Sequence, residues 1–138
     1  MKQNLAKLIE QTNQSFEITK DIINACMDAK GKDINVLDVS KVFGMSDYFI
    51  VVSGRSDRQV QGISNRILET LEKNGHTPVS VEGFEDGQWV LIDCGDIVAH
   101  VFYEPMRSHY DIESLWFKAQ RLDLKKHFKL GPKTLQAA

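Results

Sequence analysis

The chain has few of the residues and runs that mark several large protein classes. Only two cysteines are present, Cys26 and Cys94, and their wide separation fits no Cys-x-x-Cys redox or metal-binding spacing. No apolar run approaches the length of a membrane-spanning helix. The first residues show neither the apolar core of a secretory signal nor the Arg-rich pattern of a transit peptide. These absences predict a cytoplasmic protein with reduced thiols and no membrane association.

The chain also lacks a large excess of positive or negative residues. Lys and Arg total 17 and Asp and Glu total 19, which gives a net charge of −2. The chain as a whole is therefore not built to bind a polyanion. A length of 138 residues, with 42% hydrophobic and 26% charged residues, predicts one globular domain with a single core.

The most informative stretch is an apolar pair of segments joined by Cys94-Gly95-Asp96. Gly beside Asp after β-branched residues is typical of a turn, so we expect a β-hairpin with arms at residues 88–93 and 96–103. Alternation places Trp89, Leu91 and Asp93 on one face of the first arm. Because both arms are apolar on both faces, each face of the sheet should be covered, by the chain itself or by a partner.

Other elements are predicted from periodicity, caps and breakers. The expected order is a helix from Ser15 to about Lys30, strands Ile34–Val39 and Tyr48–Ser53, a helix capped by Ser56, a strand Val79–Glu82, the hairpin, a linker at residues 106–110, and a final helix from Asp111 to about Arg121. This order predicts a single α/β layered domain with a five-stranded mixed sheet flanked by helices. Three helices would leave part of the second face, near the hairpin, open to another molecule.

Segments outside that domain have a different composition. We expect residues 1–14 to be a flexible leader, residues 15–121 to be the domain, and residues 122–138 to be a basic flexible tail. The lysines of the tail could contact phosphates or simply be solvated.

Candidate chemistry is sparse. Residues 54–56 lie between a strand and a helix, where backbone N–H groups can hold a phosphate, but Ser56 and Gln59 also form a capping-box pattern. Asp93 and Asp96 could hold Mg²⁺, although Asp is common at hairpin turns. His100 lies within an apolar strand and can be a hydrogen-bonded sheet residue. We therefore expect no catalytic residue, no metal site and no cofactor.

An aromatic anchor with a charged rim is a stronger pattern. Trp89 and Leu91 share a face, and the acidic loop Glu82, Glu85 and Asp86 precedes them. This arrangement is typical of a protein-binding hot spot. Trp89 could equally be an ordinary core residue.

Three blocks of sequence resemble the ribosomal silencing factor family, also called Iojap-like. They are SDYFIVVSGRSDRQV (residues 46–60), WVLIDCGDIVAHVF (residues 89–102) and RSHYDIESLW (residues 107–116), and they occur in the family's order and spacing. The resemblance implies a nucleotidyltransferase-like fold without enzymatic activity. It implies a translational repressor that binds the large ribosomal subunit through a ribosomal protein on its joining face, blocks the small subunit under nutrient limitation, and takes part in large-subunit assembly in some lineages.

On this hypothesis Trp89 and Leu91 are the apolar anchors, Glu82 and Asp93 are acidic contacts, and His100 and Tyr103 are neighbours of the interface. The resemblance also implies homodimers that bury the same face, and the basic tail could touch ribosomal RNA. The alternative function is an active or vestigial nucleotidyltransferase that binds a nucleotide at Gly54–Ser56, although the paired Asp-x-Asp carboxylates of such enzymes are missing from the sequence.

Overall fold

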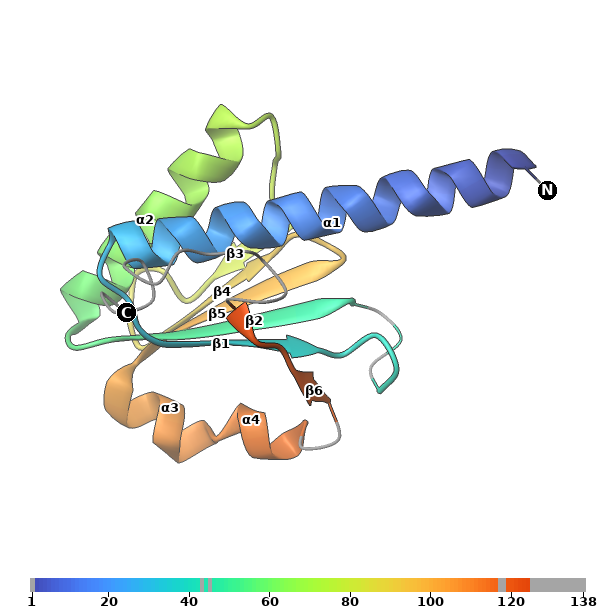
Figure 1. Ribbon diagram of the computed structural model, residues 1–138. Coiled ribbons are helices and arrows are strands. Elements are labelled where there is room, and N and C mark those ends of the chain that lie inside the picture. Colours follow the sequence, from blue (N-terminus) through green and yellow to red (C-terminus); the bar gives the residue numbers. More distant parts are fainter. Residues whose placement is uncertain (1, 43, 45, 117–118, 125–138) are drawn as a thin grey trace.

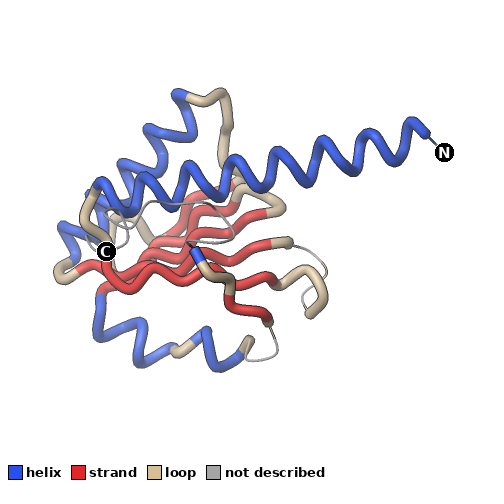
Figure 2. The backbone as a smooth tube through the Cα atoms, viewed as in Figure 1, coloured by secondary structure: helices blue, strands red, loops and turns tan. Residues whose placement is uncertain are grey.

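The computed structural model describes residues 2–42, 44, 46–116 and 119–124. Two helices lie on one face of a central sheet and two short helices lie on the other (Figures 1 and 2). The elements are α1 (Lys2–Asp28), β1 (Lys32–Asp38), β2 (Tyr48–Gly54), α2 (Asp57–Lys73), β3 (Ser80–Glu82), β4 (Trp89–Asp93), β5 (Ile97–Tyr103), α3 (Glu104–Tyr110), α4 (Ile112–Leu115) and β6 (Gln120–Arg121).

The sheet is mixed, as predicted, and its strand order is β3-β4-β5-β2-β1-β6. Among the described strands only β2 and β5 pair in parallel, and the hairpin β4–β5 is present, with each arm starting one residue later than predicted. The described sheet has six strands rather than the predicted five. The additional strand, β6, pairs with Leu37 and Asp38 of β1. Two residues are too few to produce an alternating pattern, so no sequence signal marks β6.

The main core lies between the sheet and the helices α1 and α2. Apolar residues recur at helical spacing along α2, and Val60, Ile63 and Ile67 are fully buried against the sheet. Ile22 and Cys26 of α1 are buried in the same cluster. The predicted buried stripes of both helices are therefore confirmed.

The start of the first helix was predicted wrongly. It begins at Lys2 rather than at Ser15, and its amino-terminal part extends beyond the sheet (Figure 1). Ser15 is buried, and its carbonyl accepts a hydrogen bond from Thr19 Oγ1 (2.8 Å). Because residues 2–14 contain no Gly or Pro and several good helix formers, nothing in them stops the helix. No described helix is both long and apolar enough to span a membrane.

The segment after β5 also differs from expectation. The predicted linker at residues 106–110 is helical, since α3 spans Glu104–Tyr110, and the predicted final helix is the single turn α4. Pro105 ends the strand as expected, but it also occupies the first turn of α3, where proline is well tolerated. Asp111 has a left-handed φ of 45° and separates the two helices. Four helices are thus present in the described residues, where three were expected.

Candidate functional site

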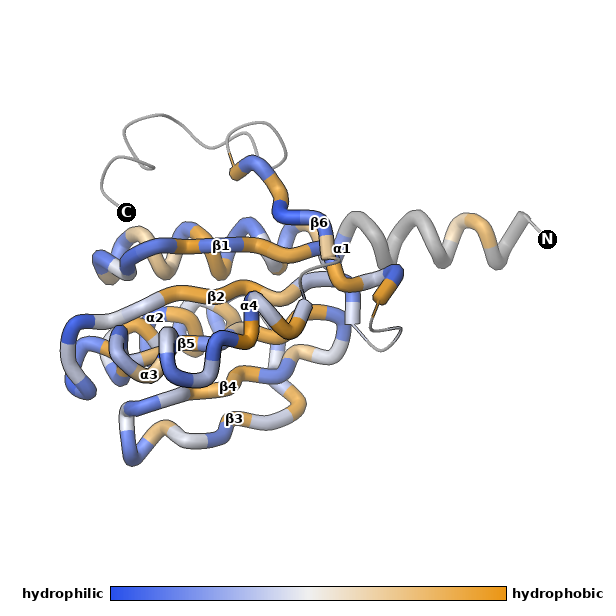
Figure 3. Tube along the Cα trace, turned by 90° about the horizontal axis from the view of Figure 1, so that it is seen from below, coloured by the Kyte–Doolittle hydropathy of each residue, from blue (hydrophilic) through white to orange (hydrophobic). Residues whose placement is uncertain are grey.

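The second face of the sheet is only partly covered. Figure 3 shows α3 and α4 lying across β5 and β2, while β4 and the edge strand β3 are left open on this side. Strand register places Leu91 of β4 beside His100 of β5, and Glu82 of β3 beside Leu91. The predicted opening near the hairpin is therefore present in the described structure.

An apolar hollow of about 360 Å³ lies on this open area. Its lining residues come from the hairpin, from the start of β2 and from the segment before β3: Ser46, Phe49, Val79, Leu91, Asp93, Gly95, Val98 and His100. Leu91 is half-buried, and Val79 exposes 73% of its surface. Contiguous apolar surface bordered by polar groups is typical of a protein-binding site rather than of a solvated face. We call this feature the apolar hollow.

Trp89 lies next to the apolar hollow but does not line it. Its ring stacks on Phe102, with centroids 4.9 Å apart, and contacts Tyr110 of α3 at 4.8 Å. Its Nε1–H donates a hydrogen bond to His100 Nδ1 (3.2 Å). Trp89 is half-buried, so it belongs to a small core under α3 while still bordering the open face.

His100 forms part of the floor of the apolar hollow and is 6% exposed. Burial lowers the pKa of its imidazole to about 4, which keeps the ring neutral near pH 7. Because Nδ1 accepts the Trp89 hydrogen bond, the single ring proton resides on Nε2. This Nε2 is shielded from solvent and finds no hydrogen-bond partner among the described residues.

Two carboxylates lie on the face of the sheet that carries the apolar hollow. Asp93 lines the hollow, and Glu82 is exposed beside Leu91 on the same face. Asp47 and Asp96 instead line two other pockets that both include Ser15 of α1. The pKa of Asp47 is raised by partial burial, and then by the neighbouring charges of Asp96 and Asp38. We call Glu82 and Asp93 the acidic rim. Unbalanced negative charge beside an apolar surface favours a basic partner.

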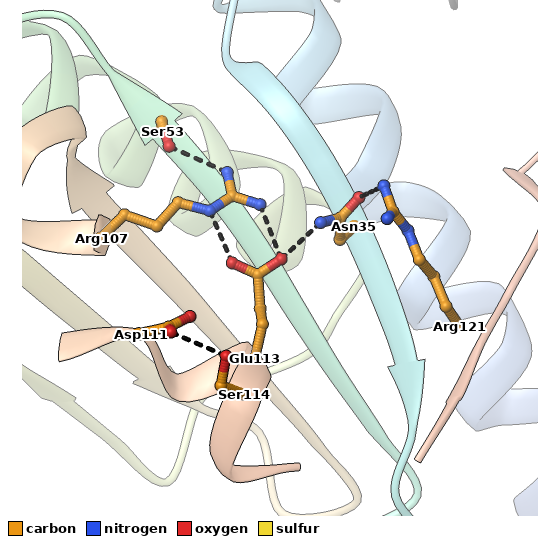
Figure 4. A network of polar contacts seen from close by, with 7 residues as sticks. All are labelled: Asn35, Ser53, Arg107, Asp111, Glu113, Ser114 and Arg121. Atoms are coloured by element: carbon orange, nitrogen blue, oxygen red, sulfur yellow. Dashed lines mark hydrogen bonds and ion pairs between the residues drawn. The ribbon is translucent and has the colours of Figure 1, made fainter. Parts of the chain in front are cut away.

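A network of polar contacts holds α3 and α4 to the sheet (Figure 4). Arg107 donates from Nε to Glu113 Oε1 (2.8 Å), from Nη2 to Glu113 Oε2 (3.1 Å), and from Nη1 to Ser53 Oγ (2.8 Å). Asn35 Nδ2 also donates to Glu113 Oε2. The hydrogen bonds from Arg107 lower the pKa of Glu113 below its usual range, although partial burial opposes them. We call Asn35, Ser53, Arg107 and Glu113 the Arg107 network.

The candidate phosphate site at Gly54–Ser56 is occupied by the chain itself. Ser56 Oγ accepts from the backbone N–H of Gln59 (3.0 Å), and Gln59 Oε1 accepts from the backbone N–H of Arg55 (2.6 Å). The side chain of Asp57 accepts from the N–H of Arg58 (2.7 Å). Ser56 therefore caps the helix as predicted, although Gln59 accepts from Arg55 rather than from Ser56, as a full capping box would require. The carboxylate of Asp57 lies in the first turn, where a phosphate would have to bind.

Replacing Ser56 with Ala should therefore act on stability alone. We expect the free energy of unfolding to fall by about 1 kcal/mol, because the N–H of Gln59 loses its acceptor. Denaturant unfolding of the variant and the wild type measures this difference. Calorimetric titration with ATP and CTP in the presence of Mg²⁺ should show no heat for either protein. A binding heat that the wild type shows and Ser56→Ala loses would instead restore the nucleotidyltransferase hypothesis.

The thiols and the histidines do not assemble into a reactive centre in the described structure. Burial raises the pKa of Cys26 to about 12, and burial together with Asp93 raises the pKa of Cys94 to about 11, so both remain weakly nucleophilic thiols. Within residues 2–42, 44, 46–116 and 119–124, no three His, Cys, Asp or Glu side chains are grouped so that they could hold a metal ion.

Comparison with known proteins identifies the family. Residues 12–137 match the family described as "Ribosomal silencing factor during starvation". The chain belongs to this family. A ribosomal silencing factor of Bacillus subtilis is 41% identical over 107 residues, which cover 78% of this chain and 91% of that protein.

The solved structures agree with this family. A crystal structure of a Chromobacterium violaceum protein superposes with a TM-score of 0.72 at 44% identity, and covers 78% of this chain and 88% of that one. A more distant mouse relative, named "mitochondrial assembly of ribosomal large subunit protein 1", is 26% identical over 98 residues, which cover 69% of this chain and 43% of the mouse protein.

Most residues proposed for this silencing factor's interface lie on one face. Leu91, Asp93 and His100 line the apolar hollow, and Trp89 borders it. Glu82 is placed on the same face by its pairing with Leu91. Tyr103 does not join them, because it packs against the main core beneath α1 and α2.

Sequence reasoning missed three apolar residues of the hollow. Phe49, Val79 and Val98 line it, but none of them was predicted to belong to the interface. Phe49 and Val98 are paired across β2 and β5, so they share a face. The strand at residues 48–53 is apolar throughout, which leaves its two faces indistinguishable in the sequence. Nothing in the sequence shows that Val79, which directly precedes strand β3, exposes its side chain.

Proposed function

We propose that this silencing factor represses translation by binding the large ribosomal subunit through a ribosomal protein on its joining face. The bound factor would then stand where the small subunit has to dock. The observation that carries the proposal is the apolar hollow with its acidic rim, located on the part of the sheet that α3 and α4 leave open. Family membership supports the ribosome as the target, and the name of the mouse relative supports its large subunit.

The open face has the chemistry that such a partner requires. Proteins of the ribosomal surface are usually basic, and Glu82 and Asp93 would attract them and set their register. Leu91 and Val79 offer apolar area that is not yet buried. An interface of roughly 800 Å² on each partner is sufficient for micromolar or tighter binding, which allows the factor to titrate free large subunits.

Repression on this proposal needs no chemical step. The helix N-terminus at Ser56 is capped internally, and the thiols of Cys26 and Cys94 have raised pKa values. The factor would act in the cytoplasm by occlusion, under nutrient limitation, and the same contact would let it accompany late assembly of the large subunit. An occluding factor alters the number of joined ribosomes and leaves the rate of peptide-bond formation in already joined ribosomes unchanged.

Sedimentation with separated ribosomal subunits tests the proposal. The purified protein should migrate with large subunits and not with small ones. When the two subunits are then mixed, fewer joined ribosomes should form as the amount of factor increases. If the protein migrates with neither subunit at micromolar concentration, the proposal is wrong. It is also wrong if the protein migrates with large subunits but leaves subunit joining unaffected.

A second copy of the chain is the competing occupant of the apolar hollow. A homodimer that buried this face would bind large subunits less efficiently per chain as protein concentration rises, since dimerisation removes free sites.

The basic tail lies largely outside the described residues, and its contact with ribosomal RNA stays a prediction. A variant that ends at Leu124 should bind large subunits with a weaker salt dependence if the tail touches phosphates.

A further inference from the structure

We propose that His100 selects the partner segment that enters the apolar hollow, by presenting a hydrogen-bond donor that has to meet a peptide carbonyl of the partner. This inference rests on the proposed function and adds the chemistry of recognition to it. The occupant of the hollow would be a protein segment that places an aliphatic side chain on Leu91 and Val98 and one of its own backbone carbonyls on His100 Nε2.

The first step of the argument is the fixed position of the ring proton. Trp89 Nε1 can only donate, and it lies 3.2 Å from His100 Nδ1. Nδ1 is therefore the acceptor, and Nε2 carries the hydrogen. The low pKa of the ring, about 4, agrees with a neutral imidazole at physiological pH. Trp89 thus acts as a positioning residue that holds His100 in its Nε2–H form.

The second step is that the Nε2–H of His100 is an unsatisfied hydrogen-bond donor. Nε2 is shielded from solvent and has no acceptor in the described part of the chain, which is a costly state for a buried N–H group. The ring lies against Phe49, with centroids 5.0 Å apart, and opposite Leu91 across the β4–β5 pair, and no oxygen of Ser46 or Asp93 in the same hollow bonds to Nε2. Leu91 is half-buried, so a shift of its side chain is the simplest way for a partner to reach Nε2.

The third step concerns which acceptor fits. Lys and Arg side chains have no acceptor atom, and an approaching carboxylate would meet the negative charge of Asp93 at the same hollow. An uncharged oxygen remains, and backbone carbonyls are the most abundant uncharged acceptors on a protein surface. A nucleic acid is disfavoured for the same reason as a carboxylate, because its phosphates would face the acidic rim.

Two substitutions at His100 separate the effect of the hydrogen-bond donor from the effect of the shape of the side chain. His100→Phe keeps a flat ring and removes the donor, whereas His100→Gln keeps an N–H donor together with an oxygen that can accept from Trp89. Binding of each full-length variant to purified large subunits is measured by sedimentation, and the melting temperature is measured in parallel. We expect His100→Phe to weaken binding by about tenfold or more, while His100→Gln stays within about threefold of the wild type.

Stability should not follow binding. His100→Phe removes the unpaired Nε2–H but also leaves Trp89 Nε1–H without its acceptor, so we expect only a small change in melting temperature. A purely structural role of His100 predicts a drop in melting temperature that parallels the loss of binding. Wild-type binding by His100→Phe, or equal losses in the Phe and Gln variants, would overturn the inference. Nitrogen-15 NMR of the histidine ring in the wild-type chain provides a test that needs no variant, since a proton on Nδ1 would also overturn it.

Failure of this inference can be told apart from failure of the proposed function. If His100→Phe binds normally but Leu91→Asp does not, the apolar hollow is the interface and the donor is irrelevant. If neither substitution affects binding to large subunits, the interface lies elsewhere and this inference is overturned, while binding to the large subunit stands. Only a wild-type chain that binds no large subunits, or that leaves subunit joining unaffected, contradicts the proposed function.

Discussion

Leu91→Asp should abolish co-sedimentation with the large ribosomal subunit without unfolding the protein. Leu91 lines the apolar hollow on an open strand, and its side chain is only half-buried in the free protein. The substitution removes an apolar anchor, which is worth about 2 kcal/mol or more at the centre of an interface. It also places a second carboxylate beside Asp93, and burying that charge against a partner costs several kcal/mol more. Binding should therefore weaken by at least about 100-fold.

Leu5→Asp is the matched control for this substitution. Leu5 is 61% exposed, does not line the apolar hollow, and belongs to the part of α1 that extends beyond the sheet (Figure 1). It should leave binding to large subunits unchanged, and both variants should retain a wild-type circular dichroism spectrum. Undiminished co-sedimentation of Leu91→Asp would show that the hollow is not the interface. Trp89 is a poorer choice for this test, because its stacking on Phe102 makes a folding defect difficult to separate from a binding defect.

The hairpin shows how much of the site was accessible from sequence. Strict alternation assigns Trp89, Leu91 and Asp93 to one face, and the structure confirms this through their register with Phe102, His100 and Val98. Alternation identifies a shared face but not the layer that covers it. The covering layer depends on α3 and α4, which were misplaced because Pro105 was interpreted only as the end of a strand and not also as the start of a helix.

The Arg107 network shows what local patterns could not predict. Arg107 and Ser53 are 54 residues apart in the sequence, and Asn35 and Glu113 are 78 apart. Nothing near any of these residues indicates that they will meet, since their contact follows from strand order and from the turn at Asp111. The network therefore belongs to the part of the fold that requires the complete topology, although Arg107 and Glu113 both lie in a sequence block that resembles the family.

Arg107→Ala should destabilise the fold more than any surface substitution on the same side of the sheet. The side chain is 11% exposed, and its guanidinium donates three hydrogen bonds, two to Glu113 and one to Ser53. Its removal leaves the partly buried carboxylate of Glu113 without its main partner, so we expect the free energy of unfolding to fall by about 2–4 kcal/mol. Denaturant unfolding measures the loss. Arg66→Ala on the exposed side of α2 is the control and should change stability by less than about 0.5 kcal/mol.

The pH dependence of stability separates the ion pair from simple packing. The pKa of Glu113 is lowered in the folded protein, so its stabilising contribution is complete above the pKa of the unfolded chain and is lost as pH falls through the folded value. In Arg107→Ala most of that contribution is lost, since only Asn35 and Arg121 still lower the pKa of Glu113, and the variant and the wild type should therefore converge in stability as the solution becomes acidic. The stability of Arg107→Lys should lie between those of Arg107→Ala and the wild type, because an ammonium keeps the charge but cannot form the bidentate hydrogen bonds to Glu113. Parallel pH profiles for Arg107→Ala and the wild type would mean that Arg107 stabilises α3 and α4 through its aliphatic stem and not through Glu113.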